Sequence, residues 1–187
     1  MQSTLAADIE FAVAAALRAL SQEEKAGVYA LSFYISDDDD DPRNPTLMVG
    51  FNTEAQCKAS VAEASSADEA RWNFAFWLQN CIASFGERES DSAGAAAEWI
   101  AAQGLAYTDA DEAADYDRCM DLGGRIVTQF VELSCGVARR LHETGVVESV
   151  FGRSIPILVH ELEYYDEIAE QTASANPPGV AAAFVAW

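Results

Sequence analysis

The sequence predicts a single α+β domain, with an antiparallel or mixed sheet packed by several helices. Segments that alternate as strands do are confined to two clusters, at about residues 28–51 and 146–163, and a long run of helical periodicity separates them. That order differs from the regular β-α-β alternation of a parallel fold. The chain has 187 residues, 50% of them hydrophobic, which is enough for one core, so we expect one domain over residues 1–187.

The first strand cluster is predicted to follow a helix and to form a hairpin. Apolar residues at helical spacing from Leu5 to Leu20 predict an amphipathic helix that ends near Gly27. Residues 28–36 then alternate, which predicts a strand with one face made of Tyr29, Leu31, Phe33 and Ile35. A second strand at 46–51 completes an antiparallel hairpin, which we expect at an edge of the core sheet.

Helices are predicted for most of the chain between the two strand clusters. Thr53 is a suitable N-cap for a helix that runs to about residue 67. The aromatic residues of 74–85 fall at helical intervals and predict a buried helix. A short helix at 98–103 follows a polar loop and ends before a glycine.

A long helical pattern covers residues 109–143, and the second strand cluster follows it. Gly123 and Gly124 predict a break or kink in the helix, because each glycine costs about 1 kcal/mol in a helix interior. Residues 146–151 and 155–163 are then predicted to be two strands joined by a short turn.

Acidic residues far outnumber basic residues. The 31 Asp and Glu against 11 Lys and Arg give a net charge of −20. Such an excess repels phosphate backbones, so we expect no nucleic-acid binding, whereas a basic protein partner would be attracted. The N-terminal residues lack a basic signal segment, and the apolar stretches are too short to cross a bilayer. We therefore expect a cytoplasmic chain without a membrane partner, as a monomer or weak homo-oligomer.

Cysteine and histidine are too few and too scattered to predict a metal site. The cysteines are Cys57, Cys81, Cys119 and Cys135, and none of them forms a closely spaced pair. We therefore expect no metal and no cofactor. In a reducing compartment the thiols would remain free, mostly as small buried apolar side chains.

Acidic loops supply the candidate partner-binding residues. These are Asp37, Asp38, Asp39, Asp40 and Asp41 at the hairpin tip, with Glu87, Glu89 and Asp91 farther along the chain. The run at the tip lacks the alternate spacing and central glycine of an EF-hand loop, so specific calcium binding is not expected. We expect these aspartates to be exposed, either as a contact for a basic partner or as a solvated turn that blunts the hairpin end.

Three further residues are candidates for ligand binding. Arg71 and Trp72 precede the aromatic segment and could hold an anionic or planar ligand by stacking and a guanidinium fork. The alternative is that Trp72 lies in the core and that Arg71 pairs with Asp68 or Glu69. His160 could act as a base, or it could be a half-buried structural imidazole in its strand.

Several segments of the chain, in order, resemble one known family. They are YALSFYISDDDDDP, FNTEAQ, ARWNFAFW and IPILVHELEY…ANPP, and together they span most of the chain. In these pieces the chain resembles the bacterial family called domain of unknown function 4303. The resemblance implies a stand-alone bacterial domain of about this length, and it implies no catalytic residue. By analogy it also suggests an immunity protein of a contact-dependent toxin system.

The predicted function is that of a non-enzymatic binding protein, an immunity or accessory factor that engages a basic protein through its acidic loops. One alternative is a small hydrolase that uses His160 or a cysteine, although no glycine-framed Ser or Cys accompanies them. Another alternative is a structural homo-oligomer that associates through the apolar tail at 180–187. The sequence offers no convergent set of nucleophile, base and acid, which favours the binding protein.

Overall fold

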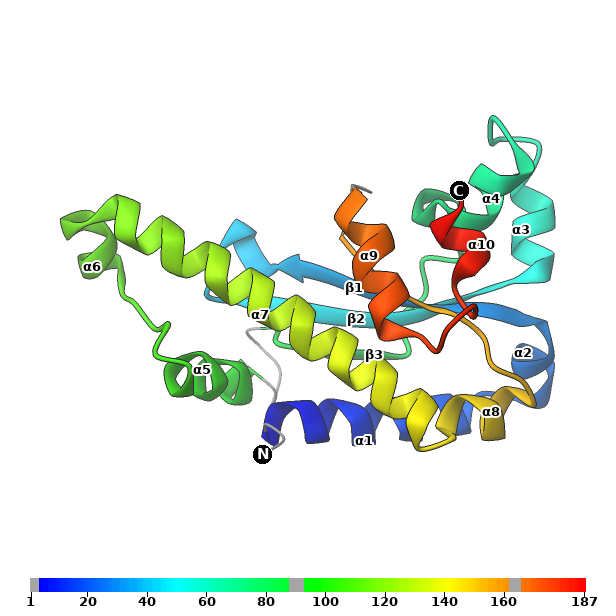
Figure 1. The fold of residues 1–187 in the computed structure, drawn as a ribbon, viewed down its shortest axis with the longest axis horizontal. Helices are drawn as coiled ribbons and strands as arrows, with labels where there is room; N and C mark the ends of the chain where they lie inside the picture. The colour runs from blue at the N-terminus through cyan, green and yellow to red at the C-terminus, as the bar shows by residue number, and fades with distance from the viewer. Residues whose placement is uncertain (1–3, 88–92, 162–165) are drawn as a thin grey trace.

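The computed structural model describes residues 4–87, 93–161 and 166–187. Helices surround one mixed sheet in an α+β fold, as predicted (Figure 1). The strands are β1 (Val28–Asp37), β2 (Pro45–Thr53), β3 (Ala83–Phe85) and β4 (Ile157–His160), and the 3-10 turns are η1 (Asp38–Asp40) and η2 (Phe74–Phe76). The α-helices are α1 (Thr4–Ala19), α2 (Gln22–Gly27), α3 (Glu54–Ser60), α4 (Ala67–Trp72), α5 (Ala93–Ala102), α6 (Asp109–Ala114), α7 (Tyr116–Glu143), α8 (Val146–Phe151), α9 (Asp166–Ala175) and α10 (Ala182–Val185).

The strand order in the sheet is β3-β2-β1-β4. β1 pairs antiparallel with β2, which confirms the hairpin, and it pairs in parallel with β4. The outer positions belong to β3 and β4, so the expectation that the hairpin forms an edge is wrong. β1 is a central strand, and its residues are buried on both faces, as is usual for a strand covered on both sides.

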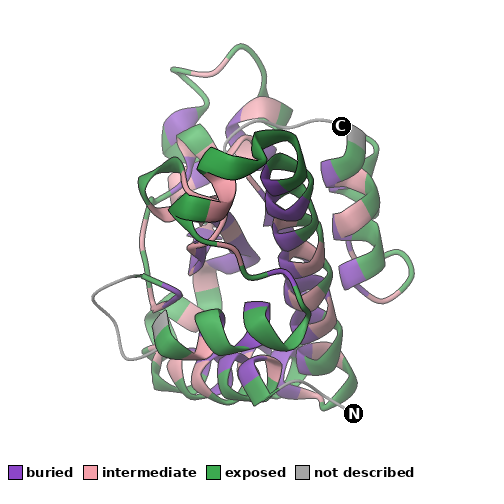
Figure 2. Ribbon diagram, turned by 90° about the vertical axis from the view of Figure 1, so that its left-hand side faces the viewer, coloured by how far each residue is buried: buried purple, intermediate pink, exposed green. Residues whose placement is uncertain are grey.

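The first face of the sheet carries the larger apolar cluster. Leu31, Phe33 and Val49 pack there against apolar side chains of α1, α5, α7 and α8. Figure 1 shows α1 and α8 on one side of the sheet, with the long α7 crossing the view. In Figure 2 the buried positions of these helices face the interior. This face is therefore the main core of the domain.

The second face of the sheet carries a smaller cluster that is rich in aromatic rings. Trp72 and Trp77 pack there with Leu158 and with Phe184 from α10. The register of β1 shifts between Val28 and Ala30, and Tyr29 joins this second cluster. The expectation that Tyr29 shares a face with Leu31 is therefore wrong, because an irregular strand does not keep strict alternation.

Residues 146–151 form helix α8 and not a strand. Gly145 has φ 72° and separates α7 from α8, whose apolar residues contribute to the main core. Four of these six residues are apolar, and so short a segment satisfies a buried helix and a buried strand equally well, so the pattern did not discriminate. In the second predicted strand, at 155–163, β4 covers Ile157–His160, and residues 162–165 lie outside the described residues.

The aromatic segment at 74–85 is not a buried helix. Helix α4 ends at Trp72, and the Asn73 side chain caps the short turn η2. The chain then extends into β3, which pairs antiparallel with β2. Trp77 is buried through contacts with the sheet, and its indole N–H donates to the Arg71 carbonyl over 2.9 Å. The aromatic residues thus cover the second face one by one and not as one helical stripe.

The long helical pattern is interrupted at Asp115, and the predicted break at Gly123 and Gly124 is wrong. Asp115 caps α7, which then continues through both glycines to Glu143. Gly123 is buried against the hairpin tip, where a Cβ would lie 2.8 Å from Pro42 Cγ. The glycine allows a close approach of helix and hairpin, which offsets its poor helix propensity.

Local capping explains several of the other helix boundaries. Thr53 caps α3 as predicted, since its side chain accepts from the Gln56 backbone N–H over 3.2 Å. The N-terminal pattern that was expected to run to Gly27 is divided in two, because Ser21 forms a capping box that starts α2. In the described part of the chain, no helix combines the length and the apolar character needed to cross a bilayer.

Candidate functional site

Several acidic segments meet at one end of the sheet. β1 and β4 are parallel, so their C-terminal ends lie side by side, and they place Asp37 near Glu161. β3 runs antiparallel to β2, so the chain leaves β3 beside Pro45 at the base of the hairpin tip, and the exposed Glu87 follows there. We define the acidic end as Asp37, Asp38, Asp39, Asp40, Asp41, Glu87 and Glu161. The other two predicted carboxylates, Glu89 and Asp91, lie outside the described residues.

The hairpin tip is a tight turn that divides the five aspartates. Asp39 and Asp40 have φ of 59° and 55°, a left-handed conformation that Asp tolerates better than most residues, and both are exposed. Asp37, Asp38 and Asp41 are half-buried, so the expectation that the whole run is exposed holds only for its middle. The tip therefore presents two carboxylates outward and turns the others towards the protein.

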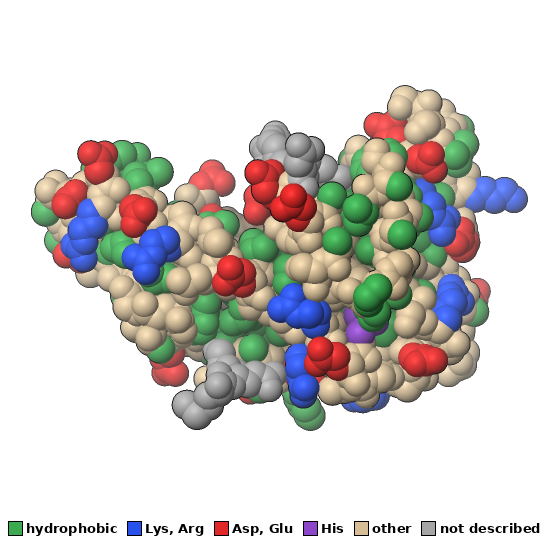
Figure 3. All heavy atoms as spheres, in the orientation of Figure 1, with side chains coloured by type: hydrophobic (Ala, Val, Ile, Leu, Met, Phe, Trp, Pro, Cys, Tyr) green, Lys and Arg blue, Asp and Glu red, His purple; other side chains and the backbone are tan. Residues whose placement is uncertain are grey.

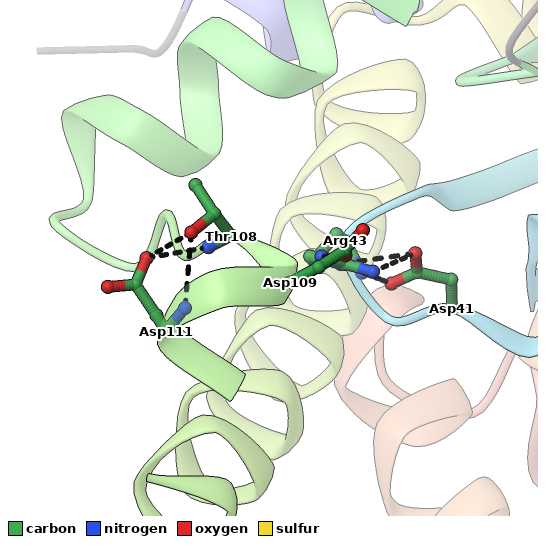
Figure 4. Close-up of polar contacts among 5 residues, drawn as sticks. All are labelled: Asp41, Arg43, Thr108, Asp109 and Asp111. Atoms are coloured by element: carbon green, nitrogen blue, oxygen red, sulfur yellow. Dashed lines mark hydrogen bonds and ion pairs between the residues drawn. The ribbon is translucent and has the colours of Figure 1, made fainter. Parts of the chain in front are cut away.

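Arg43 ties the hairpin tip to the start of α6 (Figure 4). Its guanidinium donates to Asp41 over 2.8 Å and to Asp109 over 2.6 Å, and it lies 5.1 Å from the ring centroid of Tyr107. Both carboxylates raise the pKa of Arg43 above its ordinary value, so it stays charged. Thr108 and Asp111 form a capping box that fixes the first turn of α6.

Crowding of carboxylates changes the acidity of Asp37. The pKa of Asp37 is raised to about 6, mainly by partial burial and in addition by the nearby charges of Glu161, Asp41 and Asp40. An ordinary aspartate is fully ionised well below that pH. Part of the charge at this end of the sheet therefore titrates just below neutral pH.

A shallow groove adjoins the acidic end. It has a volume of about 420 Å³ and lies between the hairpin tip and α5. Arg43, Asp109 and Tyr107 contribute to its polar side, and Ala97 and Ile100 contribute to its apolar side. A partner side chain with an apolar stem and a charged end, such as lysine or arginine, matches this mixture.

The remaining charges are dispersed on the face that Figure 3 shows. Asp and Glu side chains occur in separate spots along its whole length, and Lys and Arg side chains lie between them. The net charge of −20 is therefore not gathered into one continuous patch on this face. The acidic end differs from it because its carboxylates are held together by the strand ends and the turn.

Arg71 and Trp72 are engaged within the protein. The Arg71 guanidinium donates to both carboxylate oxygens of Glu54, over 3.0 and 2.9 Å, and lies 4.1 Å from the ring centroid of Tyr29. Trp72 is buried and makes an edge contact with Phe184. The alternative that Trp72 lies in the core and that Arg71 forms an ion pair is thus correct. The acidic partner of Arg71 is Glu54, however, and not Asp68 or Glu69 as expected from the sequence.

His160 is fully buried, with none of its surface exposed, and the expectation of a half-buried imidazole is wrong. Its Nε2 lies 2.8 Å from the Ser32 hydroxyl, and its Nδ1 lies 2.8 Å from the backbone carbonyl of Glu161. The rings of Phe74 and Tyr34 lie against it, at centroid distances of 4.7 and 5.6 Å. Burial lowers the pKa of His160 to about 4, so the ring is neutral at pH 7.

The cysteines do not join His160 in these contacts. Cys57, Cys119 and Cys135 are buried and Cys81 is exposed, and all four are free thiols. Burial raises the pKa of Cys135 and Cys81, which disfavours the reactive thiolate. Across residues 4–87, 93–161 and 166–187, no group of three or more His, Cys, Asp or Glu is arranged to hold a metal ion.

The C-terminal tail docks on the protein, as expected, through one aromatic residue. Phe184 is buried in the second cluster, whereas Val185 and Trp187 remain exposed. The tail therefore covers part of the second face and leaves two large apolar side chains at the surface.

Several residues of these sites were missed by sequence reasoning, among them Glu161, Arg43, Asp109 and Ser32. Arg43 and Asp109 are 66 positions apart, and no local pattern joins them. Ser32 alternates with apolar neighbours in β1, which marked it only as a position on the second face. A polar residue in the middle of an otherwise buried strand was the signal available for Ser32, since such groups need a buried partner.

In comparisons with known proteins, no family model matches the chain, and neither a curated protein nor a solved structure matches it.

Proposed function

We propose that the chain is a binding protein whose acidic end engages a basic protein partner, as an immunity or accessory factor in the cytoplasm of a bacterium. The observation that carries the proposal is the crowding of carboxylates at the acidic end, where the charges of Glu161, Asp41 and Asp40 add to the effect of burial in raising the pKa of Asp37. Carboxylates held together repel one another, and a cationic group placed among them relieves that repulsion. The acidic end thus gains more from a cation than dispersed surface acids do.

The fixed shape of the hairpin tip supports the proposal. Arg43 joins the tip to α6 through Asp41 and Asp109, so Asp39 and Asp40 project from a supported turn. A site that is ordered before binding loses less conformational entropy when the partner docks. The adjacent groove offers a place for the stem of a basic side chain.

The resemblance to the domain of unknown function 4303 family is part of this proposal. It supports a stand-alone bacterial domain and adds no residue to the site. The four free thiols are compatible with the reducing cytoplasm.

The test uses a synthetic arginine-rich peptide as a defined basic probe. Its binding and association rate are measured at low and at physiological salt, for the wild-type chain and for two double variants that remove the same charge. Asp39→Asn with Asp40→Asn neutralises the exposed tip, and Glu23→Gln with Glu63→Gln neutralises two exposed acids on α2 and after α3. We expect the tip variant to lose roughly fivefold in affinity, mainly through the association rate, because steering is screened first.

The control variant should lose much less affinity than the tip variant. Equal losses in both variants would mean that the peptide responds only to net charge, and the acidic end would then not be the binding site. Thermal unfolding of both variants should be close to that of the wild type, since the four side chains are exposed.

A further inference from the structure

A small pocket lies on the second face of the sheet, and Ser32 is at its wall. The pocket has a volume of about 140 Å³, and its walls come from β1, β2, η2 and the residues that follow η2. Ser32 as a whole is only 1% exposed, so this pocket is the route by which a small molecule would reach its hydroxyl. A space of this size holds a few water molecules or a short acyl chain.

The hydrogen bonds of His160 set the direction of its bond with Ser32. The Glu161 carbonyl lies 2.8 Å from Nδ1 and accepts a hydrogen bond only, so Nδ1 carries the proton of the neutral ring. Nε2 then holds a lone pair, and the Ser32 hydroxyl donates to it over 2.8 Å. This is the polarity that a histidine base requires towards a serine nucleophile, with a backbone carbonyl as the orienting group.

We infer that Ser32 is a nucleophile, that His160 is its general base, and that the adjacent pocket takes the acyl group of a short-chain acyl ester. This activity goes beyond the binding function proposed above and does not depend on it. The two sites are formed by different groups, since the acidic end includes neither Ser32 nor His160.

The reaction proceeds by acyl transfer to Ser32. The Ser32 Oγ forms a bond to the acyl carbon while its proton passes to His160 Nε2. The bond between the acyl carbon and the ester oxygen then breaks, and the departing alcohol takes that proton from His160. A water molecule repeats the two steps on the acyl-serine, so that the carboxylic acid leaves and Ser32 regains its hydrogen.

Asn80 lines the same pocket as Ser32 and carries an amide donor of the kind that stabilises an oxyanion during acyl transfer. It packs on Gly50, the cross-strand partner of Ser32, so closely that a Cβ on Gly50 would lie 2.5 Å from the Asn80 carbonyl oxygen and 2.8 Å from its Oδ1. Oδ1 also accepts from the Phe51 backbone N–H over 2.8 Å, which fixes the carboxamide. The oxygen of a carboxamide accepts hydrogen bonds and its nitrogen donates them. Because Oδ1 is held by Phe51, we assign the amide nitrogen of Asn80 as the donor to the oxyanion.

The backbone beside Asn80 also carries strain. Gln79 lines the pocket with φ 51°, a left-handed conformation that is unfavourable for a residue with a side chain. Its amide donates to the Phe74 carbonyl, which holds the segment over the pocket. Phe74 in turn stacks on Tyr34 with ring centroids 5.4 Å apart. The pocket wall formed by Gln79 and Phe74 is therefore fixed by these contacts and is not a loose surface segment.

The experiment exposes the full chain to p-nitrophenyl acetate, a small activated ester. Release of p-nitrophenolate gives the acylation rate, and intact-mass measurement with peptide mapping identifies the acetylated residue. In the wild-type chain we expect one acetyl group, on Ser32. Ser32→Ala should not be acetylated at this peptide, and His160→Gln should acylate on the order of 10²–10⁴-fold more slowly.

Two further variants separate the chemistry from the fold. Asn80→Asp keeps the oxygen that accepts from Phe51 and replaces the amide donor with a negative charge, so acylation should slow by roughly 10²-fold or more. Ser134→Ala is the matched control, because Ser134 is also fully buried and its hydroxyl has no hydrogen-bond partner among the described residues. It should acylate at the wild-type rate.

Peptide mapping of the wild-type chain decides the question even where a variant does not fold. An acetyl group on Ser32 supports the inference. A folded wild-type chain that is not acetylated, or that is acetylated at lysine, tyrosine or another serine, overturns it. Equal acylation rates of the wild-type chain and a folded His160→Gln variant overturn the role of His160.

Discussion

The guanidinium of Arg43 donates a hydrogen bond of 2.6 Å to the carboxylate of Asp109 and so joins the hairpin tip to the first turn of α6. The same guanidinium binds Asp41 within the tip. One cation therefore holds together two segments of a strongly acidic chain that would otherwise repel each other. An acidic residue is also favourable at the first turn of a helix, where the backbone N–H groups point outward.

Replacement of Arg43 by Gln should loosen this connection. We expect the free energy of unfolding to fall by about 1 kcal/mol, since the ion pairs are partly exposed and screened by solvent. Urea unfolding measures this loss, and amide exchange should show faster opening at the tip. Arg125→Gln, an exposed position on α7, is the control and should change the stability by less than about 0.5 kcal/mol. Equal losses in the two variants would contradict a bridging role for Arg43.

Gly123 and Gly124 should respond in opposite directions to alanine. A Cβ at Gly124 meets nothing within 4 Å, so Gly124→Ala should stabilise the protein by about 1 kcal/mol through helix propensity. A Cβ at Gly123 would lie 2.8 Å from Pro42 Cγ and 3.3 Å from the Tyr107 hydroxyl. Gly123→Ala should therefore cost about 1–3 kcal/mol, as overpacking does. Thermal unfolding of the two variants measures both effects, and a stabilising Gly123→Ala would refute the close approach.

Elements defined by local patterns were predictable from the sequence. The N-terminal helix has a regular apolar stripe, the hairpin has alternation on both sides of a polar turn, and Thr53 has the side chain of an N-cap. Each of these features depends on residues within a few positions of one another. They needed no knowledge of the rest of the chain.

Features that depend on distant contacts were not predictable in this way. The apolar residues of α8 suit a strand as well as a helix, and only their packing on the main core decides. The continuity of α7 through Gly123 depends on Pro42, which lies 81 positions earlier (123 − 42 = 81). The pairing of Ser32 with His160 likewise depends on the parallel arrangement of β1 and β4. Sequence spacing carries no direct signal of such relationships.

Asp37→Asn should stabilise the protein at neutral pH. The pKa of Asp37 is about 6 in the folded protein and 3.8 in the reference state, so its ionisation disfavours folding. The native state binds the extra proton between about pH 4 and 6, and this contribution to stability is therefore greatest below pH 4 and is lost as the pH rises to 6. Because the side chain is half-exposed, we expect Asp37→Asn to gain only about 1–2 kcal/mol at pH 7.

The comparison for Asp37 is its neighbour at the exposed part of the turn. Asp40→Asn also removes one negative charge, but its side chain is exposed, so it should change the stability by less than about 0.5 kcal/mol. Urea unfolding of the wild type and of both variants at pH 4.5 and pH 7 gives the change in the free energy of unfolding for each variant at each pH. A destabilising Asp37→Asn at pH 7 would contradict the raised pKa of Asp37 and the unfavourable surroundings of its carboxylate.

His160 should make the protein sensitive to acid in the opposite sense. Burial lowers the pKa of His160 from 6.5 to about 4. Above pH 6.5 the imidazole is neutral in both states, whereas between about pH 6.5 and 4 the unfolded chain binds a proton that the folded protein does not. The stability should therefore fall as the pH decreases through this window, by up to about 3 kcal/mol.

Protonation of Asp37 stabilises the folded protein as the pH falls through much of the same window, and this opposes the effect of His160. The contribution of His160 is therefore best measured in an Asp37→Asn background. In that background we expect a steady loss of stability from pH 6.5 to 4, measured by urea unfolding at several pH values. Adding His160→Gln should flatten this part of the profile, because glutamine does not titrate. It should also cost about 1–3 kcal/mol at pH 7, since the hydrogen bonds to Ser32 and Glu161 are replaced imperfectly. An unchanged slope after the substitution would show that the loss on acidification arises from other groups, and that the buried imidazole is not the acid-sensitive element of the second face.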